Sequence, residues 1–316
     1  MASGLLRRAL VGAVLLANVA VVGVATSFAS STSAPAVVAP AVRAAVPAPA
    51  APAAPAAPQV LPTLPPLLQP SPSPSPTPPP PKPAPHVAPP QDRWALLVGI
   101  TNYRSPVHDT VAGAQDISVV RDTLLRAGWR SDHIRVLTDN AATGKALQDG
   151  LTWLIGHSSA STASVFHYSG HVKQRDGHEY LWPVDNAFYS DSSVTQAMRA
   201  VRGTSWTSIA GCEAAGFDDG LADRNHLFSA SSASYEKSYE YPDWKMSVWT
   251  GVLWDQGLRK GAGDTNADGH VTVQEAVNWG APRAAQITKD QRPHGPQHPY
   301  IAGGNGALRL DAPVVG

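Results

Sequence analysis

A long proline-rich segment restricts where this chain of 316 residues can form a folded domain. Residues 30–91 consist largely of Ala-Pro and Ser-Pro repeats, and residues 1–91 hold 22 of the 30 prolines and no acidic residue. Such a segment lacks the apolar side chains and backbone N–H donors that a packed core needs. We therefore expect residues 30–91 to form a disordered, extended stalk, which at about 3.1 Å per residue reaches roughly 180 Å.

Residues 1–29 have the features of an export signal. Arg7 and Arg8 precede an apolar run over residues 9–25, and the small residues typical of a cleavage site end at Ala29. This apolar run is long for a cleaved signal and short for a membrane span, so an uncleaved signal anchor is the alternative to a signal peptide. Both predict a secreted or membrane-anchored protein with its folded part outside the cytoplasm, tethered to a membrane or cell wall where the anchor is kept.

The charge balance changes where the stalk ends. Residues 92–316 carry 20 basic and 24 acidic side chains, a net charge of −4. This excludes a strongly basic nucleic-acid-binding protein, because there is no surplus of Lys and Arg to follow a phosphate backbone. These residues can bury the core of one domain. Cys212 is the only cysteine, so no intrachain disulfide stabilises that domain.

From residue 92 onward, apolar runs typical of buried strands alternate with segments of helical periodicity. Residues 94–100 form one continuous apolar run, and Ile117, Val120 and Leu124 then recur at helical spacing before Gly128. The same reading predicts a helix at 145–155 and strands at 133–138, 163–169, 206–211 and 227–231. The alternation predicts an α/β fold, a mostly parallel sheet with helices on both faces. In such sheets, functional residues lie where loops leave the carboxyl ends of strands.

His171 and Cys212 each follow the end of a predicted strand. If the two strands are parallel neighbours, the two side chains lie close together. A thiolate is a nucleophile, but a free thiol with a pKa near 8.5 needs an adjacent imidazole or another electropositive neighbour to ionise at neutral pH. The spacing therefore predicts a catalytic dyad. The alternative is a buried cysteine and a hydrogen-bonded loop histidine without catalytic function.

Residues 264–275 fill every position of a 12-residue EF-hand loop. Gly269 occupies the position of the sharp turn, and helices are expected on both sides, at 248–258 and at 274–279. The expected Ca²⁺ ligands are Asp264, Asn266, Asp268, His270 through its carbonyl, Thr272 and Glu275. We expect a structural Ca²⁺ site; the alternative is a polar turn without an ion. No phosphate-binding loop motif is present, and no organic cofactor is expected.

Five segments, in this order along the chain, resemble the caspase-like cysteine peptidases, in particular bacterial metacaspase-like members. They are residues 94–100, 112–116, 168–171 and 180–185 and the cysteine loop ending at Gly216 and Phe217. The resemblance covers about residues 93–310. It implies the caspase fold, a six-stranded sheet between helices, with His171 and Cys212 as the dyad of an endopeptidase. The implied partner is a protein or peptide substrate.

The resemblance also implies an oxyanion site. In the family, backbone N–H groups of the cysteine and of the residue after the histidine stabilise the developing oxyanion, and here these residues are Cys212 and Val172. The family usually has Gly in place of Val172, Asp in place of Ala210 and Ser in place of Ala214. These departures support two alternatives: a catalytically impaired caspase-fold binding module, or a calcium-stabilised surface domain without activity.

Substrate preference is a further implication of the resemblance. Caspases that cut after Asp use an Arg at the position matched by Val111, so cleavage after Asp is not expected here. Metacaspases that cut after Arg or Lys use two acidic residues, one matched by Asp116 and the other replaced by Ala210. We therefore expect a reduced preference for Arg or Lys before the cut, carried by Asp116.

Overall fold

The computed structural model describes residues 92–304 and 308–311. The predicted signal or anchor at 1–29 and the predicted stalk at 30–91 lie outside the described residues. Within the described residues, no helix has the length and apolar character needed to cross a membrane.

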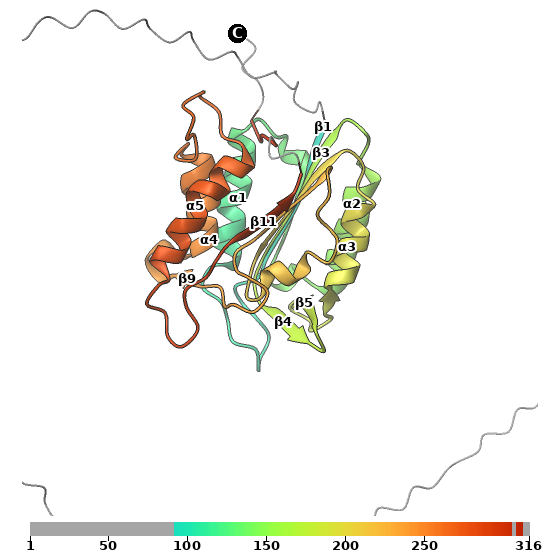
Figure 1. Ribbon diagram of the computed structural model, residues 1–316. Coiled ribbons are helices and arrows are strands. Elements are labelled where there is room, and N and C mark those ends of the chain that lie inside the picture. The colour runs from blue at the N-terminus through green and yellow to red at the C-terminus, as the bar shows by residue number, and fades with distance from the viewer. Residues whose placement is uncertain (1–91, 305–307, 312–316) are drawn as a thin grey trace, which may run out of the picture. The chain divides into compact units, whose positions relative to one another are not determined.

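A six-stranded sheet forms the centre of the domain, in the order β11-β8-β7-β3-β1-β2 (Figure 1). Its strands are β1 (Asp92–Gly99), β2 (Ile134–Thr138), β3 (Thr162–Ser169), β7 (Thr204–Ala210), β8 (His226–Ala230) and β11 (Tyr300–Gly303). All neighbouring pairs are parallel except β8 and β11. The predicted mostly parallel six-stranded sheet is confirmed.

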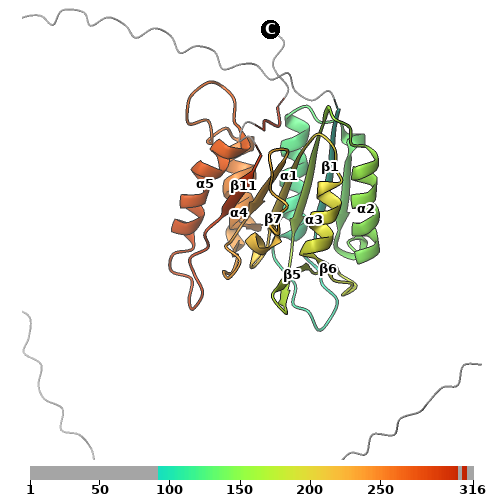
Figure 2. The same cartoon turned by 45° about the vertical axis from the view of Figure 1, so that its right-hand side comes forward.

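Helices cover both faces of this sheet, which explains why the central strands β3 and β7 are buried along their length without alternation. One face carries α1 (Gly113–Arg126), α4 (Val248–Thr250) with its continuation η5 (Gly251–Arg259), and α5 (Val273–Ile287) (Figure 1). The other carries α2 (Gly144–Gly156) and α3 (Asp191–Arg199) (Figure 2). Buried tryptophans fill the first interface, where Trp206 on β7 stacks on Trp254 at 4.4 Å.

Two small sheets lie at the carboxyl ends of the central strands, at the bottom of Figure 1. One consists of β4 (Val172–Arg175), β5 (His178–Leu181) and β6 (Tyr189–Ser190). The other pairs β9 (Glu240–Tyr241) with β10 (Met246–Ser247). Neither sheet was predicted from the sequence, nor were α3 and β11, because these elements are short or carry many polar side chains.

The helix after the EF-hand-like loop is longer than predicted. We expected it to end near residue 279, but α5 continues through Pro282 to Ile287. Proline removes one helical hydrogen bond, but Pro282 and Asn278, whose carbonyl would have accepted that bond, are both exposed, so water can solvate the carbonyl. Burial of Ala284 on the core side continues the helix.

Candidate active site

The sheet register brings the two predicted catalytic residues to the same edge. Ser169 on β3 pairs with Ala210 on β7, and the N–H of Gly170 donates to the Ala210 carbonyl at 3.1 Å. His171 and Cys212 are therefore each two residues beyond paired positions on neighbouring parallel strands. The juxtaposition expected from the sequence is the one that the backbone adopts.

The imidazole of His171 is held by the loop after β1. Its Nε2 lies 2.8 Å from the His108 carbonyl, which can only accept, so Nε2 carries the proton. The His171 backbone N–H donates to the Tyr103 hydroxyl at 2.8 Å, and the two rings lie 4.7 Å apart. In the neutral imidazole these bonds leave Nδ1 as the proton acceptor, which is the arrangement that a general base requires.

Cys212 is largely enclosed, and burial raises the pKa of its thiol. The Sγ atom lies 4.0 Å from the Ser238 carbonyl, and none of the hydrogen bonds among residues 92–304 and 308–311 joins it to His171. The negative charges of Glu213 and Glu240 also raise this pKa, whereas the ammonium of Lys237 lowers it. The resting thiol is therefore protonated at neutral pH, and a nucleophilic role requires proton transfer to a base.

A strained turn follows the cysteine. Glu213 has a φ of 49°, in the left-handed region that non-glycine residues adopt rarely. Its N–H donates to the Glu236 carbonyl at 2.8 Å, and its carboxylate forms an ion pair with Lys237. These contacts hold the turn, which places Cys212 at the end of β7 in front of the short 3₁₀ helix η3 (Ala214–Phe217). Left-handed strain of this kind is common at functional sites.

Val172 keeps its N–H available although it replaces the glycine of the family pattern. Trp182 N–H donates to the His171 carbonyl at 3.2 Å, so Val172 and Leu181 form the next, non-hydrogen-bonded pair of the antiparallel ladder. The Val172 N–H therefore points away from β5. Val172 is not among the residues with positive φ, so its branched side chain is not strained there.

The side chain of Val172 is accommodated by Gly211. A Cβ atom on Gly211 would lie 2.7 Å from Val172 Cγ2 and 2.9 Å from the Gly170 carbonyl oxygen. No side chain fits at this position without displacing its neighbours. Within the described residues, no backbone hydrogen bond uses the Cys212 N–H. Both donors expected for the oxyanion site are thus free of ladder partners.

Asp116 is fully buried next to the strand ends. One carboxylate oxygen accepts from the Ser169 hydroxyl at 2.7 Å, and the other accepts from the Ser247 N–H at 3.0 Å. Burial raises the pKa of Asp116 from 3.8 to about 6, against the lowering effect of these hydrogen bonds. Among residues 92–304 and 308–311 no cation pairs with this carboxylate, so a negative charge is held next to the candidate dyad, an arrangement typical of sites that take a cation.

Glu240 is a site residue that the sequence analysis missed. Its carboxylate accepts the N–H groups of Val111 and Ala112 at 2.8–2.9 Å, at the start of α1. It lies across the β9–β10 pair from Ser247, whose N–H binds Asp116. A sequence signal did exist: Ala112, at the N-cap of α1, has no side-chain acceptor, so another segment must supply one. The sequence does not indicate which segment, because the partner is 128 residues away.

The predicted Ca²⁺ ligands lie in the loop before α5 and at its first turn, but the carboxylate oxygens of Asp264, Asp268 and Glu275 do not all lie within 4.8 Å of one another among the described residues. Asn266 Nδ2 lies 2.7 Å from Glu275 Oε1 and 3.2 Å from Asp268 Oδ2, and Asp264 accepts the N–H groups of Asp268 and Gly269. Glu275 also accepts the Thr272 N–H as part of a capping box. These oxygen-rich side chains are of the type that Ca²⁺ prefers, but the Asn266 oxygen accepts the Asp268 N–H at 2.8 Å, so the amide would have to turn before this oxygen could bind an ion.

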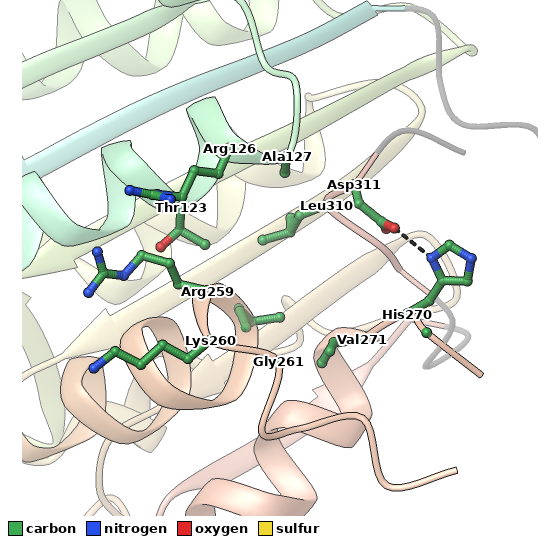
Figure 3. Close-up of a pocket in the computed structure, with 12 residues that line it drawn as sticks. Thr123, Arg126, Ala127, Arg259, Lys260, Gly261, His270, Val271, Leu310 and Asp311 are labelled. Atoms are coloured by element: carbon green, nitrogen blue, oxygen red, sulfur yellow. Dashed lines mark hydrogen bonds and ion pairs between the residues drawn. The ribbon is translucent and has the colours of Figure 1, made fainter. Parts of the chain in front are cut away.

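A cavity of about 380 Å³ lies beside this loop (Figure 3). Arg126, Arg259 and Lys260 line one side, and His270 faces it from the loop, with Nδ1 2.8 Å from Asp311. The cavity is at the far end of α1 from Asp116, so it is separate from the candidate dyad.

The structure also assembles a group that the sequence did not reveal. Ligand-type atoms of His178, Asp191 and Asp219 lie within 4.8 Å of one another. Asp191 is buried at the first turn of α3 and lies 3.1 Å from His178 Nδ1, whereas His178 and Asp219 are exposed. The three residues come from β5, α3 and the loop after η3, so no short spacing could have identified them.

Comparisons with known proteins agree with this architecture. The family model of the caspase domain matches residues 92–297, and the chain belongs to this family of peptidases. "Metacaspase-1" of Schizosaccharomyces pombe is 29% identical over 112 residues, which cover 30% of this chain and 26% of the relative. "Metacaspase-1" of Candida albicans is 34% identical over 88 residues, covering 26% of this chain and 19% of the relative. The chain thus matches about a quarter or less of these relatives' length.

A solved structure shows the same fold at low identity. Protein GSU0716 from Geobacter sulfurreducens superposes with a TM-score of 0.53 at 13% sequence identity. The match covers 70% of this chain and 99% of that chain. At this identity the likeness supports the fold alone.

Proposed function

We propose that this protein is an exported cysteine endopeptidase that uses Cys212 as nucleophile and His171 as general base and acid. The observation that carries this proposal is the tautomer of His171. Its Nε2–H is bound to the His108 carbonyl, so Nδ1 remains for the proton of a thiol on the neighbouring strand end.

The reaction follows from these positions. His171 Nδ1 takes the thiol proton as Sγ attacks the scissile carbonyl carbon, and the resulting oxyanion accepts the N–H groups of Cys212 and Val172. The imidazolium then gives its proton to the leaving amine, the C–N bond breaks, and an acyl-enzyme remains. Water hydrolyses the thioester with His171 acting as base. The raised pKa of Cys212 makes this base essential, because the resting thiol does not ionise on its own.

The negative charges next to the dyad support a preference for Arg or Lys before the cut. Asp116 carries one charge and Glu240 a second, and Val111 provides no cation to receive an acidic side chain. Because Asp116 has no exposed surface and Ala210 replaces the second acidic residue of the family pattern, we expect this preference to be weaker than in relatives with two buried carboxylates.

Two further properties are part of the proposal. Asp264, Asn266, Asp268, His270, Thr272 and Glu275 would hold a structural Ca²⁺, which would fix the loop to the start of α5. Export, and tethering through the N-terminal segment, would place the domain where millimolar Ca²⁺ is often available, so that a site with a Kd of about 10⁻⁴ to 10⁻³ M would be filled.

A thiol-directed probe tests the proposal. A peptidyl-Arg acyloxymethyl ketone should label the wild-type protein at Cys212, the only cysteine, and labelling should fall sharply in His171→Ala. A His157→Ala variant serves as control, because His157 is an exposed histidine at the end of α2. Equal labelling of wild type and His171→Ala would contradict the dyad. Absence of labelling in the wild type would favour the catalytically impaired binding module.

A further inference from the structure

An aromatic cluster beside His171 has no role in the chemistry described above. The Trp182 ring lies 6.0 Å from the His171 ring and 5.1 Å from Phe188, and Tyr180 meets Phe188 edge-on at 6.2 Å. Phe188 is 41% exposed although it is a large apolar side chain. We call Tyr180, Trp182 and Phe188 the aromatic platform. Exposed aromatic clusters beside reactive side chains are typical of ligand-binding surfaces.

The platform is fixed by hydrogen bonds before any ligand binds. Trp182 Nε1 donates to the Asn186 side chain at 2.7 Å, and the Trp182 N–H donates to the His171 carbonyl. Asn186 has a φ of 60°, which turns the chain so that Phe188 packs against Trp182. A ligand that stacks here therefore orders few side chains, which lowers the entropic cost of binding.

The chemistry of His171 determines which part of a substrate meets this platform. The imidazolium must protonate the leaving amine, so the chain on the amine side of the cut begins beside His171. Asp116 and Ser247 lie with α1 and β10 on one side of the strand ends, whereas the platform belongs to β5 and the loop before β6 on the side of α2 and α3 (Figures 1 and 2). A peptide with its cation toward Asp116 therefore leaves the site across Trp182.

We infer that the aromatic platform is a subsite for a large apolar side chain, preferably aromatic, within two residues after the cut. This inference rests on the proposed peptidase function and assigns its leaving-group specificity. Lys173 Nζ lies 5.8 Å from the Trp182 ring centroid, so a second basic side chain at this place meets like charge. The enzyme would thus prefer a cationic side chain before the cut and an apolar ring after it.

Internally quenched peptides with Arg before the cut test this inference. Peptides with Phe or Leu in the two positions after the cut should be cleaved with a kcat/KM about tenfold above that of the Gly peptide, as expected for partial burial of one such side chain. The Lys peptide should be no faster than the Gly peptide. Phe188→Ser should bring the Phe-to-Gly ratio close to one, whereas Val136→Ser, which removes a similarly exposed apolar side chain from β2, should leave it unchanged.

A fluorogenic Arg-amide, which has no residue after the cut, separates the possible failures. Phe188→Ser should cleave this amide at the wild-type rate. Equal rates on all quenched peptides, or a uniform loss in Phe188→Ser that includes the amide, would overturn the subsite while leaving the peptidase proposal intact. A wild-type protein that cleaves neither the amide nor the peptides would refute the proposed function itself, and the subsite with it.

Discussion

Asp116→Asn should stabilise the protein while weakening its substrate preference. Burial raises the pKa of this carboxyl from 3.8 to about 6, and each pKa unit corresponds to about 1.4 kcal/mol between the two protonation states. Folding with an ionised Asp116 is therefore less favourable by about 3 kcal/mol than folding with a neutral side chain at this position, and at pH 7 the carboxyl is mostly ionised. Asparagine resembles that neutral form, since its oxygen can accept the Ser247 N–H while its NH₂ group donates to the Ser169 hydroxyl.

The pH dependence of the unfolding free energy tests whether the buried charge of Asp116 causes this difference in stability. Between pH 4 and 6 the folded state binds more protons at Asp116 than the unfolded state, so the wild type loses stability as pH rises through this window. The difference between Asp116→Asn and wild type should be near zero below about pH 4 and reach about 2–3 kcal/mol above pH 6, equivalent to a Tm increase of roughly 5–10 °C. Thermal unfolding at pH 4, 5, 6 and 7 measures it.

Matched controls make the experiment specific. Asp122 lies on the same helix, but hydrogen bonds from Arg126 and Arg259 lower its pKa, so Asp122→Asn should give no gain at pH 7. On peptides with Arg or its neutral isostere citrulline before the cut, Asp116→Asn should lose the preference for Arg while keeping cleavage of the citrulline peptide. A loss of stability at pH 7, or a gain independent of pH, would refute the argument.

Three other predictions follow from neighbouring features. Ala210→Asp should increase the preference for Arg over citrulline, because it adds a second carboxylate beside Asp116; an unchanged ratio in peptide profiling would contradict this. Gly211→Ala should destabilise the fold by about 1–3 kcal/mol in urea titrations, because its Cβ would meet Val172 at 2.7 Å, and a neutral result would show that the strand end can relax. Millimolar Ca²⁺ should raise the Tm, and Asp264→Ala should remove the increase; if the increase persists, the ion binds elsewhere, for example at the group that contains Asp191.

The central strands, and the placement of His171 and Cys212 at neighbouring strand ends, were predictable because their signals are local. β1 is a nearly continuous apolar run, and the strands that precede His171 and Cys212 are short segments of β-branched, aromatic and small residues, so parallel-sheet geometry brought these two strand ends to the same edge. The EF-hand-like pattern is local too, since its expected ligands lie within 12 consecutive residues, and Ca²⁺ binding there stays a prediction.

The rest of the site depends on contacts between distant segments. Glu240 reaches the start of α1, and Asp191 approaches Asp219 only after α3 has packed on the sheet. The aromatic platform was missed because β5 and β6 are short and Phe188 belongs to neither. No periodicity in the sequence encodes such contacts, because they result from the packing of the whole domain.

Hydrolysis of a peptidyl-Arg amide by single and double variants of the dyad tests the central claim most directly. Members of one catalytic unit fail together, so Cys212→Ala, His171→Ala and the double variant should each lose at least about 10³-fold in kcat, with a double loss no greater than the larger single one. All three should keep the wild-type circular dichroism spectrum. Cleavage by Cys212→Ala at the wild-type rate, or losses that multiply in the double variant, would contradict a Cys–His dyad.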